Sequence, residues 1–320
     1  MTISQRVAKY KSPNKKAVIP LTLFRTVSNC SSNLPAIKQP QFSRLLMVYC
    51  LRCFCSKEPV DRYGVLAPAI DGANKYIKCI DKDLKTLTKI SERHPDALPS
   101  LDGTIKYFNN RKSNIAKIIN NTCESVISPV PSFHDQICLL ASFTAYEMML
   151  DQSPANIISR YNNADLKDIG NLEVMLMRSI GFFEKERLNV INYPTYLNDF
   201  AYSETITSGR PDLLCDDALV RVSLSKSKPN SKDTLHILTE YVMGLQSGIE
   251  HYKNVKRIVI WNPFMDAGYI CDVSDIPKSI IDQVKTDVIQ YTWELPSNTT
   301  SNKEVDPSST TRICEEWGFK

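Results

Sequence analysis

Residues 209–228 read GRPDLLCDDALVRVSLSKSK, and this stretch decides the fold class of the chain. It contains two short runs of apolar and β-branched residues, Leu213–Leu214 and Ala218–Leu224, which are typical of β-strands. The Asp216-Asp217 pair between the two runs has the composition of a tight turn. We therefore predict a strand, a turn and a second strand at this point.

The sequence that follows predicts a helix and two further strands. Apolar residues recur every three or four positions between Asp233 and His251, which is the spacing of a helix. The runs Arg257–Trp261 and Tyr269–Val273 again have the composition of strands, and a final helix is expected after Pro277. We expect a small mixed sheet flanked by helices in the C-terminal half of the chain.

The N-terminal half is expected to be helical, so the predicted fold class is mixed α/β. Ile169, Leu172 and Leu176 recur at helical spacing, and Gly181 follows where a glycine often ends a helix. Prolines interrupt the helical spacing of apolar residues between the other expected helices. The expected helices span residues 75–93, 104–120, 133–151 and 165–180.

Charge is distributed very unevenly along the chain. The net charge is only +4, but no acidic residue precedes Glu58, so residues 1–57 carry +10 and the remaining residues carry −6. A basic segment attached to a mildly acidic body favours a polyanionic partner. The ten cations are Arg6, Lys9, Lys11, Lys15, Lys16, Arg25, Lys38, Arg44, Arg52 and Lys57.

This basic segment predicts an extended arm that binds single-stranded RNA. Four prolines and many Ser and Asn residues before residue 45 disfavour continuous helix or strand. Aromatic side chains among the cations would stack on unpaired bases. A mitochondrial presequence, or an arm that binds a capsid or a protein partner, would have a similar composition. The expected binding residues of the arm are Arg6, Lys9, Lys11, Lys15, Lys16, Phe24, Arg25, Phe42 and Arg44.

These patterns divide the chain into four parts. The basic arm covers residues 1–57, and a mainly helical region covers residues 58–164. The α/β core is expected at residues 165–296. Residues 297–320 are rich in Ser, Thr and Asn at their start and are expected to form a flexible tail.

The order of helices and strands across residues 165–275 resembles the core of PD-(D/E)XK nucleases. Pro211 and Asp212 stand on the first predicted strand, and Lys226 follows the second. In that family an aspartate and a second acidic residue hold Mg²⁺, and a lysine two residues further on positions the attacking water. The resemblance implies a restriction-endonuclease-like fold for the core.

Two positions depart from the pattern of that family. Arg221 stands where the second acidic residue is expected, and Ser223 stands where the lysine is expected. A cation cannot hold Mg²⁺ but can contact a phosphate, so we expect this surface to bind nucleic acid without cutting it. Its binding residues would be Arg221, Lys226, Lys228 and Lys232.

The alternative is an active, Mg²⁺-dependent nuclease with a displaced lysine. It would use Asp212, Asp217 and Lys226 as catalytic residues. Glu173, Asp212 and Asp217 would be its metal ligands. Each of these acids also has an ordinary structural interpretation, in a turn or on the solvent face of a helix.

The ten cysteines are too few for a disulfide scaffold, so reduced thiols are expected. Cys50, Cys53 and Cys55 have a spacing that could hold zinc with Cys79 or His94, but structural zinc sites normally contain two clear ligand pairs. We therefore predict free thiols that bind no metal, and no cofactor for the protein.

No secretory signal and no membrane-spanning helix are predicted. Lysines interrupt the first 20 residues, and the most apolar helical stretch, residues 133–150, contains His134, Asp135 and Glu147. Together with reduced cysteines, this favours a cytoplasmic protein.

The overall character is similar to that of nonstructural RNA-binding proteins of double-stranded RNA viruses, particularly the cypoviruses of the reovirus group. That resemblance implies a viral protein in the host cytoplasm, with single-stranded viral RNA as its ligand and a homo-oligomer or a viral protein as a further partner. We predict a non-catalytic nucleic-acid-binding protein that favours single-stranded RNA. The alternatives are the Mg²⁺-dependent nuclease and a viral structural or assembly protein whose arm binds a protein partner.

Overall fold

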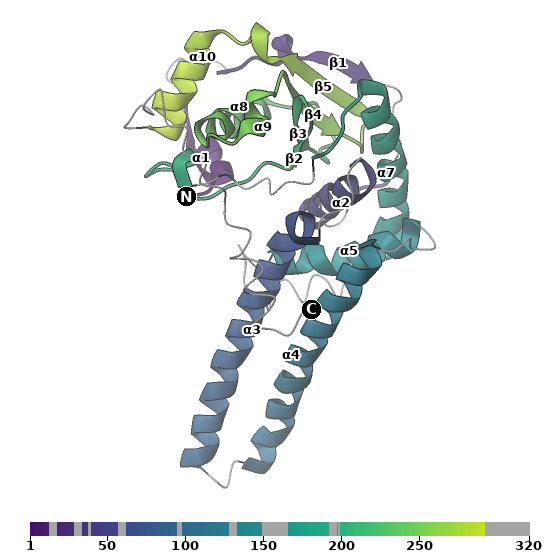
Figure 1. Ribbon diagram of the computed structural model, residues 1–320, viewed down its shortest axis with the longest axis vertical. Coiled ribbons are helices and arrows are strands. Elements are labelled where there is room, and N and C mark those ends of the chain that lie inside the picture. Colours follow the sequence, from purple (N-terminus) through teal and green to yellow (C-terminus); the bar gives the residue numbers. More distant parts are fainter. Residues whose placement is uncertain are drawn as a thin grey trace.

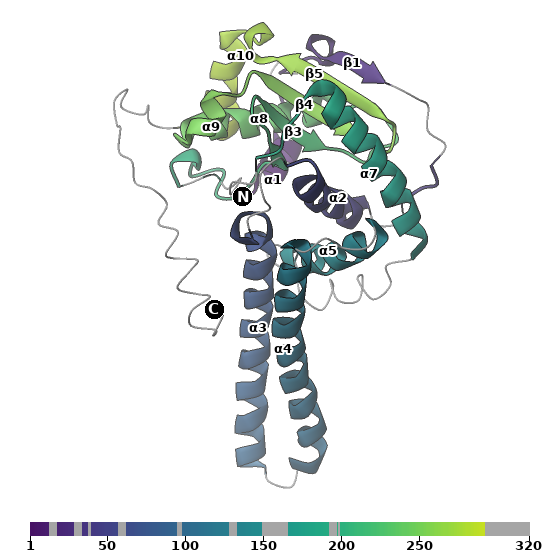
Figure 2. The same ribbon diagram turned by 45° about the vertical axis from the view of Figure 1, so that its right-hand side comes forward.

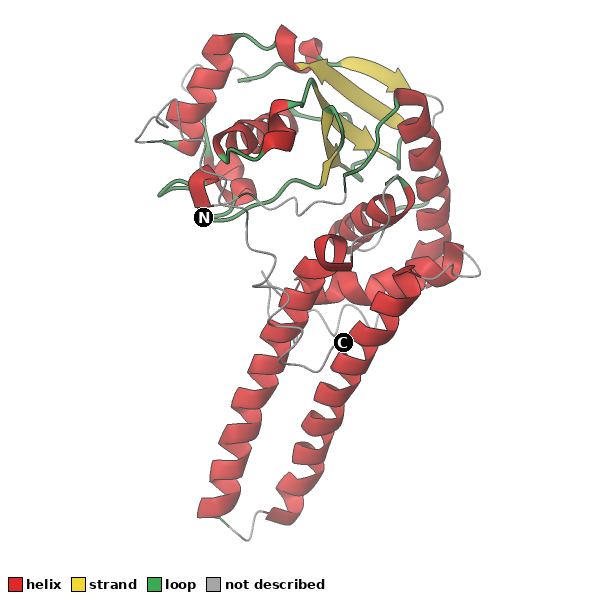
Figure 3. Cartoon of the chain, viewed as in Figure 1, coloured by secondary structure: helices red, strands yellow, loops and turns green. Residues whose placement is uncertain are grey.

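The computed structural model shows an α/β body with a long helical hairpin projecting from it (Figure 1). Figure 3 shows the same view with helices, strands and loops distinguished by colour. The structure describes residues 1–12, 18–28, 34–37, 40–56, 62–94, 98–127, 133–148, 166–191, 197 and 199–291. Its main helices are α1 (Ile3–Lys9), α2 (Pro40–Phe54), α3 (Arg62–Arg93), α4 (Leu98–Ile127), α5 (Phe133–Met148), α7 (Leu166–Glu186), α8 (Ser231–Gln246), α9 (Glu250–Lys253) and α10 (Lys278–Gln283).

The strands of the described residues form one mixed sheet in the order β1-β5-β4-β3-β2. Strands β3 and β4 are parallel, and the other neighbouring pairs are antiparallel. A parallel pair needs a crossover connection, which α8 supplies. The predicted mixed α/β fold class, with a helical N-terminal half and a sheet in the C-terminal half, is confirmed. The strands are β1 (Arg25–Ser28), β2 (Leu213–Leu214), β3 (Ala218–Val222), β4 (Arg257–Asn262) and β5 (Ala267–Asp272).

Helices cover both faces of this sheet, as Figures 1 and 2 show. Alternate residues of a strand point to opposite faces, so each strand contributes to two separate apolar clusters. On β4, Val259 and Trp261 join α2, α5 and α7 in one cluster. Ile258 and Ile260 of the same strand join α1 and α8 in the other. The body is therefore built from a sheet between two helical layers.

Helices α3 and α4 run side by side in opposite directions and project away from the sheet (Figures 1 and 2). Their base packs against α5, and α3 lies so close to α5 at Gly72 that a β-carbon there would overlap the carbonyl oxygen of Tyr146. Within the described residues, no helix is long and apolar enough to cross a membrane.

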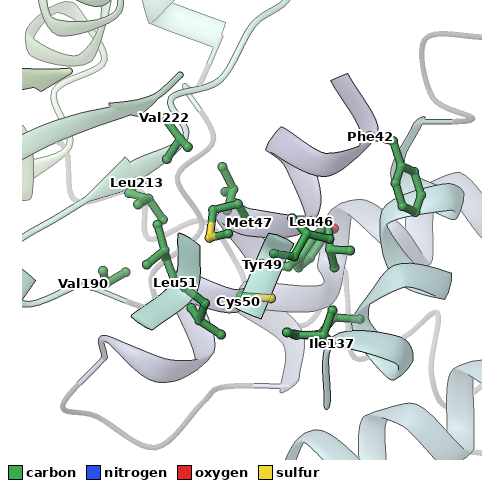
Figure 4. Close-up of a cluster of buried hydrophobic side chains, with 14 of the residues drawn as sticks. Phe42, Leu46, Met47, Tyr49, Cys50, Leu51, Ile137, Val190, Leu213 and Val222 are labelled. Atoms are coloured by element: carbon green, nitrogen blue, oxygen red, sulfur yellow. The ribbon is translucent and has the colours of Figure 1, made fainter. Parts of the chain in front are cut away.

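The expected extended arm at residues 1–57 is wrong for the described residues, because they contribute α1, β1 and α2 to the body. Helix α2 places Leu46, Met47 and Leu51 in the cluster that Figure 4 shows, beside Leu213 and Val222 of the sheet. Burial of this apolar helix face stabilises the folded segment. On α2, Arg44 pairs with Asp212, and the buried Arg52 donates to the backbone carbonyl of Asp212 at 2.8 Å.

The other boundaries need smaller corrections. Helix α7 continues through Gly181 to Glu186, so this glycine does not end it. The expected helix 233–251 is divided between α8 and α9, and the helices expected at residues 75–93 and 104–120 are parts of the longer α3 and α4. The core is not confined to residues 165–296, because β1 pairs with β5. The tail 297–320 lies outside the described residues.

Candidate nucleic-acid interface

The candidate site lies at the carboxyl end of β3, where three chain segments meet. Asp212 directly precedes β2, and the pairing of Leu213 with Val220 places it beside Arg221 on β3. Residues 223–230 then connect β3 to the first turn of α8. The side-chain amide of Asn262 on β4 donates to the carbonyl of Ser225 at 2.7 Å, which anchors this connection to the sheet.

Asp212 is a buried carboxylate whose acceptor positions are occupied by donors from the protein. Arg44 of α2 donates through Nη1 to both carboxylate oxygens at 2.6 Å, and the backbone N–H of Val222 donates at 2.9 Å. Burial by itself would raise the pKa of Asp212, but Arg44, Arg221 and these hydrogen bonds hold it below its usual value. Asp212 is therefore an ionised anchor for Arg44.

Glu240 of α8 performs the same task for Arg221. Its side chain is only 1% exposed, and its Oε1 lies 3.4 Å from Arg221 Nη1 and 3.0 Å from His236 Nε2. The second carboxylate oxygen, Oε2, is buried and has no hydrogen-bond partner in the described part of the chain. Arg221 is thus held by a buried acid while 18% of its side chain remains exposed.

A third buried acid, Glu147 of α5, holds Arg210. It forms an ion pair with Arg210 and accepts a hydrogen bond from the hydroxyl of Tyr49 on α2. Burial and the charge of Glu147 raise the pKa of Tyr49 well above its usual value, so this hydroxyl keeps its proton. Tyr49 therefore remains a donor that fixes Glu147 in place.

We call Arg44, Arg210 and Arg221 the arginine cluster, because three buried acids hold them close together. Asp212 raises the pKa of Arg44, burial lowers it, and Glu240 and Glu147 add to the increase, so all three acids act on this one guanidinium. The exposed fractions of the arginine side chains are 30% for Arg44, 22% for Arg210 and 18% for Arg221. Each guanidinium pairs with a buried acid, and each arginine side chain is partly exposed.

Exposed lysines lie next to this cluster along the chain. Lys226 and Lys228 are exposed in the connection between β3 and α8. Lys232 donates to the carbonyl of Ala8 at 3.4 Å, which brings the end of α1, with exposed Lys9 and Lys11, beside the start of α8. The structure therefore joins the predicted C-terminal basic residues to part of the predicted arm.

Several predicted binding residues are not available at this surface. Phe24 and Phe42 are 6% and 8% exposed and belong to the two apolar clusters, so the expected stacking of bases on them is wrong. Arg6 donates to the carbonyls of Asp287 and Val288. Arg25 lies on β1 at the opposite edge of the sheet and pairs with Glu186. Lys15 and Lys16 lie outside the described residues.

The residues of the nuclease alternative are dispersed. Asp217 pairs with Arg257 at 2.6 Å, Glu173 lies on α7, and Lys226 is exposed in the connection after β3. Among the residues that the structure describes, no group of three His, Cys, Asp or Glu side chains is arranged to hold a metal ion. The alternative ligand set is therefore not brought together.

The cysteine motif lies in and just after α2. Burial raises the pKa of Cys53 to about 12 and that of Cys55 to about 12, and it raises the pKa of Cys50 well above its usual value. These thiols are protonated near neutral pH, which makes them poor metal ligands and slow nucleophiles. Cys79 and His94 are exposed on α3 and directly after it.

Sequence reasoning missed the residues that organise the site. Arg210 stands in the quoted string beside Pro211 and Asp212, and Glu240 follows His236 by one helical turn, so both had a local signal. Comparison of the chain with protein-family models, with curated proteins and with solved structures gave no match.

Proposed function

We propose that the protein is a non-catalytic nucleic-acid-binding protein, with single-stranded RNA as its expected ligand. The arginine cluster is the observation that carries this proposal. A guanidinium held in place by a buried carboxylate loses little conformational freedom when it meets a phosphate, and its planar N–H groups match two phosphate oxygens. Lys226, Lys228 and Lys232 add charge beside it that attracts a polyanion from solution.

The same geometry supports binding without cleavage. Arg44 occupies both carboxylate oxygens of Asp212, and Arg221 stands beside it. Two guanidiniums around a single carboxylate repel a divalent cation and favour an anionic ligand. The nuclease alternative would require Asp212 to exchange Arg44 for a metal ion.

A preference for single-stranded over double-stranded nucleic acid cannot come from stacking of bases on Phe24 and Phe42, because both rings are buried. Contacts to phosphates position a nucleic acid and carry little information about its bases. The preference for single strands is therefore the part of the proposal that a direct comparison of ligands must decide.

The test is fluorescence anisotropy with labelled 20-nucleotide RNA and DNA, single- and double-stranded, at several salt concentrations. We expect tightest binding to single-stranded RNA. The variant Lys226→Gln/Lys228→Gln/Lys232→Gln should bind at least tenfold more weakly. The slope of log affinity against log salt should flatten by about 2, since each lost phosphate contact on a single strand contributes about 0.7.

The matched control is Lys253→Gln/Lys256→Gln/Lys278→Gln, which removes three exposed cations from α9, from the residue preceding β4 and from α10. It should leave the affinity within about twofold, because long-range charge is screened at physiological salt. Equal weakening by both variants, or no binding by the intact protein at low salt, would contradict the proposal. Mg²⁺-dependent cleavage of the RNA that Asp212→Asn abolishes would establish the nuclease alternative instead.

A further inference from the structure

Helix α3 carries a row of cations on its outer side that the candidate site does not include. The row consists of Lys75, Lys78, Lys82, Lys85, Lys89 and Arg93, all of them exposed. At about 100° per residue these six positions fall within an arc of about 80°, and no other residue between 75 and 93 falls in that arc. We call these residues the lysine row.

The lysine row faces away from the rest of the hairpin. The buried residues of the same helix, among them Ala73, Ile77 and Ile80, are centred on the opposite side, where α4 and α5 pack. The row extends for about 27 Å along the helix axis, at about 1.5 Å per residue. It therefore forms a straight, one-sided line of positive charge on the part of the molecule that projects into solvent.

Cations outnumber acids on this side of α3. On a solvated helix face, an acid three or four residues from a base stabilises the helix, because the two charges are opposite. Each cation of the lysine row has another cation at one of these spacings, which destabilises the isolated helix, and Asp71, Asp81 and Glu92 are the acids at these spacings. Asp81 of the same helix pairs with Lys112 of α4 instead, at 2.8 Å. A polyanion lying along the row would relieve the repulsion.

The row leads toward the candidate site. Asp71 lies at the base of α3, one helical turn before Lys75. Burial raises the pKa of Asp71, and the charges of Arg210 and Lys78 lower it, so the row and the arginine cluster act on the same carboxylate. Gly72 packs against the backbone of Tyr146 and Glu147 on α5, and Glu147 forms the ion pair with Arg210, so the two basic surfaces are neighbours at the junction of hairpin and body.

We infer that the lysine row binds the sugar-phosphate backbone of a nucleic acid and continues the interface that begins at the arginine cluster. This inference rests on the proposed function and extends it to the hairpin. A regular line of point charges on a rigid helix fits a ligand whose negative charges are also regularly spaced, as the phosphates of a nucleic-acid strand are. An acidic protein segment would need an acid at every third or fourth position over 27 Å, a length of about 18 helical residues, whereas every nucleotide of a strand carries a phosphate.

The experiment uses the full-length protein with Lys78, Lys82, Lys85 and Lys89 all replaced by Gln. Binding to labelled 20-nucleotide single-stranded RNA and to a 20-base-pair RNA duplex is measured by anisotropy across a salt series. We expect affinity to fall at least tenfold at low salt, and the salt slope on single-stranded RNA to flatten by about 2.8. The two ligands show whether one strand or a duplex occupies the row.

The control replaces Lys106, Lys117, Lys253 and Lys278 by Gln, which changes the net charge by the same amount away from the row. The row variant should melt at about the same temperature as the intact protein, because the substitutions remove like-charge repulsion along α3 together with weak attractions to Asp81 and Glu92. A fold defect is thereby separated from lost binding.

Equal binding by the row variant and the control overturns the inference and leaves the proposed function standing, provided that the Lys226/Lys228/Lys232 variant is impaired. Absence of binding by the intact protein overturns both. Competition by polyglutamate as strong as that by unlabelled RNA, at equal charge concentration, overturns the assignment of a nucleic acid to the row.

Discussion

Each of the three ion pairs of the arginine cluster joins a buried acid to an arginine whose side chain is partly exposed. Removing the acid from such a pair lowers the free energy of unfolding by more than the intact pair contributes to it. The arginine charge is then left partly desolvated and without its partner. Asp212 gives the clearest case, since it also accepts a hydrogen bond from the backbone of Val222. Its role in the folded state can therefore be measured through stability.

We expect Asp212→Asn to lower the free energy of unfolding at pH 7 by about 2–3 kcal/mol. The folded pKa of Asp212 lies below its unfolded value of about 3.9. The carboxylate therefore stabilises the protein above about pH 4, and this contribution disappears as pH falls through the folded pKa. Urea unfolding at pH 7, 5 and 3 should show the two proteins converging in acid.

Asp272→Asn is the matched control, because Asp272 lies on the same sheet but is exposed at the end of β5. It should change stability by less than about 0.5 kcal/mol at any of these pH values. If the difference in free energy of unfolding between Asp212→Asn and the intact protein is the same from pH 7 to pH 3, the loss of stability comes from altered packing and not from the lost charge.

Individual residues were placed correctly where neighbouring sequence determines their position. The sequence of residues 209–228 predicts that Asp212 lies beside Arg221, and the pairing of Leu213 with Val220 agrees with this. The pairing of Asp212 with Arg44 could not be predicted, because 168 residues separate them and nothing in either neighbourhood indicates the other. For the same reason, Arg44 was assigned to a free arm.

At the scale of elements, the junction of α3 with α5 depends on the missing side chain of Gly72. A β-carbon there would lie 1.8 Å from the carbonyl oxygen of Tyr146, so the helices can approach this closely only at glycine. We expect Gly72→Ala to destabilise the protein by about 1–3 kcal/mol, despite the better helix propensity of alanine. Thermal unfolding followed by circular dichroism measures the change.

Gly103→Ala provides the comparison on α4, where a β-carbon would meet nothing within 4 Å. This change should be neutral or should stabilise the protein by about 0.5–1 kcal/mol through helix propensity. If Gly72→Ala is also neutral or stabilising, the packing of α3 against α5 does not depend on the missing side chain of Gly72.

The elements themselves were predicted from composition and periodicity, with instructive exceptions. The strands after residue 209 have the β-branched runs that a buried sheet requires, and all were found. Helix α2 was missed because Pro40 looked like a break, whereas proline is well suited to the first turn of a helix. Gly181 looked like a helix end, but the apolar pair Phe182 and Phe183 carries α7 onward into the core.

At the scale of the whole molecule, apolar burial is concentrated in the body and the base of the hairpin. Among described side chains, α3 has none buried between residues 81 and 94, and α4 has none between 101 and 114. Helix α8, by contrast, is buried continuously from Thr234 to Gly244. Local stability should therefore decrease toward the tip of the hairpin.

Hydrogen–deuterium exchange with peptide-level mass spectrometry measures this gradient. Backbone amides of residues 84–93 and 101–110 should exchange at least a hundredfold faster than those of residues 235–244, because opening the tip exposes little apolar surface. Saturating single-stranded RNA should slow exchange in α3 if the lysine row is occupied. Uniform protection from the tip to the body would show that hairpin and body unfold as one unit.

The contacts of residues 6 and 25–28 with residues 267–288 can form only late during synthesis. Arg6 donates to the carbonyl of Val288, 282 residues later, and β1 pairs with β5 and with no other strand of the described residues. At roughly 5–20 residues per second, a ribosome needs about 15–55 s to make the partner. Until those partners are synthesised, residues 1–57 must stay in solution without forming compact non-native structure. Ten cations with no acid among them meet that requirement through mutual repulsion, independently of any ligand.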